Sequence, residues 1–187
     1  MILSFLFICL AARLLDMITM GQSNRMFFVT YHSSLVNPLT YLRFFTHVFG
    51  HASWEHLTGN AMYILLLGPM LEEKYGPATI LELMAVTAFA TGIINYVLFW
   101  NIALCGASGI CFAFILLTSF TGFKEGEIPL TVLLVAAVFI GQQILEGMFV
   151  KDNISNLSHI IGGIVGAVFG FLWNRKKPVK PETVYSI

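Results

Sequence analysis

Residues 159–173 read HIIGGIVGAVFGFLW, an apolar run with one ionisable side chain, His159, at its start. Gly162, Gly166 and Gly170 lie three, seven and eleven positions after His159, so all four share one face of a helix. Glycines four residues apart let two membrane helices approach to backbone distance. The stretch therefore predicts a helix whose closest contact with a neighbour is on the face that carries His159.

The composition of the whole chain agrees with a membrane location. Of its 187 residues 57% are hydrophobic and 11% are charged, whereas soluble domains carry about 25% charged residues. The formal net charge is zero, and the basic cluster that starts at Arg175 follows an apolar run, as a topology anchor does. The chain is thus predicted to be an all-α integral membrane protein in a lipid bilayer, without a nucleic-acid partner.

Six apolar stretches approach the roughly 20 residues that a membrane span needs. They are residues 2–20, 56–71, 78–100, 107–122, 128–147 and 154–173. Residues 21–55 are too polar to span but rich in aromatic side chains, which predicts a folded outer loop at the membrane interface. The expected architecture is a single membrane domain, residues 1–187, that ends in a tail at 174–187.

The distribution of Lys and Arg predicts the orientation. With six spans both termini lie on one side, and that side collects Lys74, Lys124 and the cluster after span 6. Positive charge favours the cytoplasm. We therefore expect both termini in the cytoplasm and residues 21–55 outside. Because Met1 leads directly into an apolar run, we also expect a retained first span with no soluble domain before it.

Three polar residues in different spans are predicted to lie at one depth. Each precedes the inner end of its span by sixteen positions: His56 before Glu72, Ser108 before Lys124, and His159 before Arg175. Sixteen helical residues rise about 24 Å, against a hydrocarbon core of about 30 Å. The three side chains should meet a few ångströms below the outer surface.

These residue types suit nucleophilic catalysis. A serine hydroxyl is inert until a neighbouring imidazole accepts its proton, which assigns Ser108 as nucleophile and His159 as general base. His56 and Asn60, at i and i+4 on one helical face, and the Ser108 backbone N–H are candidate oxyanion donors. No aspartate within the spans is placed to orient His159, so we expect a dyad with the Phe112 ring against His159.

The chain resembles the rhomboid family of intramembrane serine proteases over residues 38 to 173. The resemblance is carried by His56-x-x-x-Asn60, Gly106-x-Ser108-Gly109 and His159-x-x-Gly162-x-x-x-Gly166. Arg43 and His51 match the pattern of the outer loop, and Glu72 matches the inner end of the second span.

The resemblance implies a six-helix bundle with a half-submerged first outer loop and a Ser–His dyad open to the periplasm of a bacterial inner membrane. It also implies single-span membrane proteins as substrates, cut near the outer face, and a movable gate and cap around residues 148–153. In the family pattern Gly106, Gly109, Gly162, Gly166, Arg43, His51 and Glu72 support the site. Phe112 stands where relatives usually carry a tyrosine, which places rate and substrate preference in question.

Other functions fit the sequence less well. His47 and His51 are at metal-ligand spacing, but His56 is expected on another element and the zinc-protease signature His-Glu-x-x-His is missing. No cofactor or metal is expected. The alternative is a catalytically silent rhomboid-like protein that binds membrane helices, although such a protein has no need to keep Ser108 and His159. A transporter would place charges through both leaflets rather than at one depth.

Overall fold

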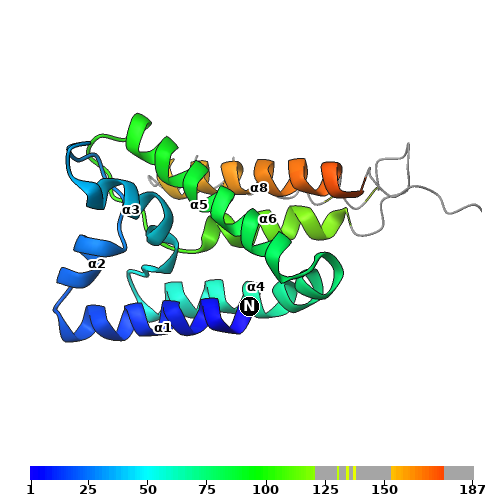
Figure 1. Cartoon of the computed structure of the whole chain (residues 1–187), viewed down its shortest axis with the longest axis horizontal. Helices are drawn as coiled ribbons and strands as arrows, with labels where there is room; N and C mark the ends of the chain where they lie inside the picture. Colours follow the sequence, from blue (N-terminus) through cyan, green and yellow to red (C-terminus); the bar gives the residue numbers. More distant parts are fainter. Residues whose placement is uncertain (121–129, 131–133, 135–136, 138–152, 175–187) are drawn as a thin grey trace, which may run out of the picture.

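The computed structural model describes residues 1–120, 130, 134, 137 and 153–174. These residues form helices joined by short loops: α1 (Ile2–Ile18), α2 (Gln22–Phe27), α3 (Pro38–Thr46), the 3₁₀ turn η1 (His47–Phe49), α4 (Trp54–Tyr75), α5 (Pro77–Leu98), α6 (Ser108–Ser119) and α8 (Asn153–Asn174). In Figure 1, α4, α6 and α8 all start at the end of the bundle where α2 and α3 gather, and α1 lies antiparallel to α4. Residues at the starts of α4, α6 and α8 can therefore meet.

The helices follow the apolar stretches predicted from the sequence. Stretches 2–20, 56–71, 78–100, 107–122 and 154–173 correspond to α1, α4, α5, α6 and α8 respectively, with ends that differ by up to four residues. Stretch 128–147 lies outside the described residues except for three helical positions, and so does the tail after Asn174. By length and composition, α5 and residues 156–174 of α8 could cross a membrane, while α6 is a shorter apolar helix.

Local sequence signals set the helix starts. The Ser53 hydroxyl accepts the His56 backbone N–H at 3.1 Å and caps α4. Gly76, at φ 86°, turns the chain between α4 and α5, and Pro77 occupies the first turn of α5. Because the cap fixes where α4 begins, it also fixes which face of α4 carries His56 and Asn60.

The glycine face of α8 packs directly on a neighbouring helix, as predicted, and that neighbour is α6. A Cβ atom built on Gly162 would lie 2.0 Å from the Gly109 carbonyl oxygen, and one on Gly166 would lie 2.1 Å from the Ala113 carbonyl oxygen. Real Cβ atoms do not approach other atoms so closely. Only glycine therefore permits this spacing, and α6 packs more extensively against α8 than against any other described element.

Residues 21–55 form a folded segment rather than an irregular loop. It contains α2, α3 and η1, and an isolated antiparallel bridge joins Thr30 to Leu104 in the loop before α6. Arg43 is buried, donates from Nε to the Leu39 carbonyl oxygen at 3.0 Å, and lies 4.3 Å over the Tyr31 ring. Arg43 thus connects parts of the segment 21–55 to one another.

Two charged side chains at the bundle ends have structural partners. Arg13 pairs with Asp16 at 2.9 Å, as expected from their i, i+3 spacing. Glu72 accepts the Ile2 backbone N–H at 3.0 Å, with the Met1 nitrogen at 2.8 Å. Glu72 thus satisfies free N–H groups at the start of α1, which have no partner within that helix.

Candidate active site

Ser108 is the first residue of α6, and Gly106 shapes the turn before it. Gly106 has φ 117°, a conformation that side chains rarely adopt, and its N–H donates to the His47 carbonyl oxygen at 2.9 Å. A Cβ atom on Gly106 would lie 2.5 Å from His56 Nε2 and 3.6 Å from Asn60 Nδ2. Both predicted donors therefore converge beside the turn that presents Ser108. Since the first N–H groups of a helix have no partner within it, the Ser108 N–H is available at the same place.

The hydrogen bonds of His51 decide how the Asn60 amide is oriented. His51 Nδ1 lies 3.1 Å from the Phe49 carbonyl oxygen, which can only accept, so Nδ1 carries the proton. In the neutral ring Nε2 is then an acceptor, and it lies 3.1 Å from Asn60 Nδ2. The Asn60 NH₂ group therefore donates one hydrogen to His51 and keeps the other for the region beside Gly106.

Cys111 contacts the other side of Asn60. Its Sγ lies 3.6 Å from the Asn60 backbone oxygen and 3.8 Å from Oδ1, which suits a weak S–H donor. The sequence analysis did not assign Cys111 to the site. Its position one turn after Ser108 on α6 was the signal that could have done so.

His159 lies against α6 at Phe112, one turn after Ser108. The Phe112 and His159 ring centroids are 4.3 Å apart, which confirms the predicted ring contact. A Cβ atom on Gly109 would lie 3.4 Å from the carbonyl oxygen of Ser158, and the Gly109 backbone touches Gly162. Ser108 and His159 each adjoin a residue of this contact, so the two side chains belong to facing turns of α6 and α8.

Two histidines of the segment 21–55 are buried in neutral form. Burial lowers the pKa of His47 and that of His51 from 6.5 to about 4, and the charge of His56 lowers the pKa of His51 further. His47 is held by the Arg43 carbonyl oxygen at 3.1 Å and by the Thr91 hydroxyl at 3.2 Å. Each of the two rings thus has hydrogen-bond partners within the protein, and one partner of His51 is Asn60, a predicted oxyanion donor.

The predicted residues fall into two groups. Those around the start of α6 come together: His51, His56, Asn60, Gly106, Ser108, Gly109, Phe112, His159 and Gly162. Gly166 lies one turn further along the contact between α6 and α8. Arg43 and Glu72 lie elsewhere, in α3 and at the far end of α4.

Comparison with known proteins identifies the class of this helical bundle. A family model described as the Rhomboid domain matches residues 38–176, and the chain therefore belongs to the rhomboid family. Among its relatives is the Rhomboid protease GlpG of Yersinia pestis (strain Pestoides F), 26% identical over 180 residues, which are 95% of this chain and 64% of that protein. The Rhomboid protease GlpG of Serratia proteamaculans (strain 568) is 26% identical over 171 residues, 90% of this chain and 60% of that protein. The chain spans less than two thirds of the length of these relatives.

Proposed function

We propose that the protein is an intramembrane serine endopeptidase that works through a dyad of Ser108 and His159. The observation that carries the proposal is the convergence at the start of α6. His56 Nε2 and Asn60 Nδ2 adjoin Gly106 on one side, and the backbone of Gly109 meets the α8 turn that carries His159 on the other. Family membership supports the same assignment.

The dyad would act by acyl transfer. His159 takes the proton of the Ser108 hydroxyl while Oγ attacks the carbonyl carbon of the peptide bond. The imidazolium then protonates the leaving amine, and water hydrolyses the acyl-enzyme with His159 again as base. In this role the Phe112 ring orients His159 by packing, in place of the carboxylate of a triad.

The oxyanion would be stabilised by His56, by Asn60 and by the Ser108 backbone N–H. Preorganised donors are effective because they are already aimed at the developing charge. His51 would preserve that aim, since its Nε2 accepts from Asn60 and keeps the amide nitrogen directed toward the site.

The membrane setting follows the sequence predictions. We propose a single domain with six spans, both termini in the cytoplasm of a bacterial inner membrane, and residues 21–55 half-submerged on the periplasmic side. Substrates would be single-span membrane proteins, cut near the periplasmic face. The predicted fifth span, 128–147, lies outside the described residues except for positions 130, 134 and 137, and the predicted gate at 148–153 lies outside them except for Asn153.

The test is covalent labelling of the purified protein in detergent with a fluorophosphonate probe. Wild type should be labelled, and Ser108→Ala should abolish labelling with no change in thermal unfolding. His159→Ala should lower the labelling rate strongly, and Asn60→Ala should lower turnover by about 10- to 10³-fold. Wild type that is folded but unlabelled would refute the dyad and favour a silent helix-binding protein.

A second measurement addresses the substrate class. Proteoliposomes that contain a single-span membrane protein should yield two fragments whose masses place the cut near the outer end of its span. Labelling by the probe without such cleavage would retain the nucleophile and reject the proposed substrate.

A further inference from the structure

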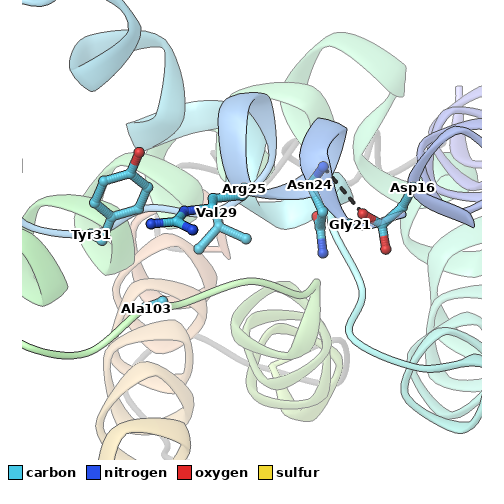
Figure 2. Close-up of a pocket in the computed structure, with 7 residues that line it drawn as sticks. All are labelled: Asp16, Gly21, Asn24, Arg25, Val29, Tyr31 and Ala103. Carbon is cyan, nitrogen blue, oxygen red and sulfur yellow. Dashed lines mark hydrogen bonds between the residues drawn. The ribbon is translucent and has the colours of Figure 1, made fainter. Parts of the chain in front are cut away.

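A cavity of about 410 Å³ lies outside the candidate active site, between the end of α1, helix α2, the following residues 28–31 and the loop before α6. Figure 2 shows Asp16 bonded to Asn24 at one end of the cavity, Arg25 extending toward Tyr31 at the other, and Ala103 across from them. The cavity therefore joins two segments far apart in the sequence, which the bridge between Thr30 and Leu104 also connects.

The uncompensated charge of this cavity is positive. Asp16 is 8% exposed, its carboxylate pairs with Arg13 at 2.9 Å, and it also accepts the Asn24 backbone N–H at 3.3 Å. Arg25 is exposed, and in the part of the chain that the structure describes its guanidinium pairs with no acidic side chain. Because the charge of Arg13 neutralises that of Asp16, Arg25 determines which charge the ligand carries. The ligand must therefore have an anionic group.

Neutral hydrogen-bonding groups accompany Arg25. Tyr31 and Asn24 line the same cavity, and neither side chain forms a hydrogen bond with another described side chain. The Tyr31 ring is fixed from behind by Arg43, 4.3 Å away. A guanidinium fork with adjacent hydroxyl and amide donors suits the several oxygens of a phosphate better than a single carboxylate.

Exposed apolar side chains lie close in sequence to the cavity residues. Ile18 is 78% exposed and Met20 92%, three residues and one residue before Gly21, and Met26, 50% exposed, follows Arg25. Such side chains have no role around a site for a soluble anion, but they match the hydrocarbon that begins just below a lipid headgroup. The ligand should therefore be amphiphilic, with its phosphate in the cavity and its acyl chains against these exposed apolar side chains.

We propose that this cavity binds a glycerophospholipid by its headgroup. Arg25 holds the phosphate, Tyr31 and Asn24 donate to the remaining headgroup oxygens, and Met20 and Met26 contact the upper part of the acyl chains. The bound lipid would tie α2 to the loop that leads to Ser108. Lipid binding itself does not depend on the proposed protease activity, so a failure of either proposal leaves the other standing.

The experiment is a titration of the purified full chain in detergent with dioleoylphosphatidylglycerol, followed by native mass spectrometry. Arg25→Gln should raise the Kd at least about tenfold, as loss of a charged hydrogen-bond donor does, with unchanged thermal unfolding because Arg25 is exposed. The Kd of Arg25→Lys should lie between those of wild type and Arg25→Gln, because lysine keeps the positive charge but lacks the forked guanidinium. Lys74→Gln removes a cation at the far end of α4 and should leave the Kd unchanged.

Two further ligands identify what is recognised. Dioleoylglycerol, which lacks the phosphate, should not bind measurably, and inorganic phosphate at millimolar concentration should not displace the phospholipid. Equal Kd values for wild type and Arg25→Gln, or equal losses in Arg25→Gln and Lys74→Gln, would overturn the proposal. Retention of dioleoylglycerol, or full competition by inorganic phosphate, would overturn it as well, because the ligand would then be a neutral amphiphile or a soluble anion.

Discussion

The substitution Gly162→Ala tests the contact on which the candidate dyad depends. The added Cβ would lie 2.0 Å from the Gly109 carbonyl oxygen, 2.7 Å from its carbonyl carbon and 2.9 Å from its Cα. Ordinary contact begins at 3.4 Å, so the shortest approach is too close by 1.4 Å (3.4 minus 2.0). All three atoms belong to the backbone of α6, which cannot move aside as a flexible side chain can. The two helices must therefore separate by more than an ångström, one turn from His159.

Two measurements should respond to this separation. Overpacking of this kind costs about 1–3 kcal/mol, which should lower the midpoint of thermal unfolding. A displacement of about 1 Å between nucleophile and base can cost about 10²-fold in rate, which should appear in the fluorophosphonate labelling of the protein that remains folded.

The matched control is Gly59→Ala on α4, where an added Cβ would meet nothing within 4 Å. Alanine is the better helix former by about 1 kcal/mol, so this variant should be as stable as wild type or more stable and should label normally. If Gly162→Ala unfolded and labelled like Gly59→Ala, the backbone contact between α6 and α8 would be refuted.

Three further predictions concern hydrogen bonds and protonation. Labelling should be slower in Asn60→Ala and in His51→Leu than in wild type. If His51 acts through Asn60, the double variant should label no more slowly than Asn60→Ala alone. Additive losses in the double variant would contradict that role of His51. Thr91→Val keeps the methyl group beside Gly109 but removes the hydroxyl that meets His47, so it should destabilise the fold by about 1–3 kcal/mol, seen in thermal unfolding, with labelling per folded molecule unchanged. His47 and His51 have pKa values of about 4 when folded and 6.5 when unfolded, so between these values the unfolded chain binds more protons. The unfolding midpoint should therefore be steady above about pH 7 and fall as the pH drops from 6.5 toward 4; a midpoint that rises over this range would show that the two rings are protonated in the folded state.

The sequence predicted the features that depend on regular helix geometry. The spacing of Gly162 and Gly166 from His159 indicated the face of α8 that meets a neighbour, and both glycines lie on α6. Counting sixteen residues from the helix ends indicated that His56 and Ser108 lie at the same depth. In the structure His56 adjoins Gly106, in the turn before Ser108. Helical rise and periodicity are constant, so such positions can be calculated from a sequence.

Several features that were not predicted depend on contacts between segments that no helical periodicity connects. His51 follows the 3₁₀ turn η1, and only the path of that turn brings its Nε2 to Asn60. The partner of Glu72 comes from α1, seventy residues away, because free N–H groups at a helix start can be satisfied by any nearby acceptor. The cavity beside Arg25 likewise combines α2 with a loop before α6, and no periodicity connects those segments.

The backbone contact between α6 and α8 has a consequence for how the protein responds to its surroundings. The described approach of Gly162 and Gly166 to α6 involves carbonyl oxygens and Cα atoms, which neither titrate nor attract counterions. The spacing of the two helices should thus be insensitive to ionic strength, unlike one maintained by surface ion pairs. Cα–H groups facing carbonyl oxygens at such short range can also form weak hydrogen bonds, which strengthen as water is excluded. A lipid environment would then hold the helices that carry Ser108 and His159 together more firmly than a hydrated detergent micelle does.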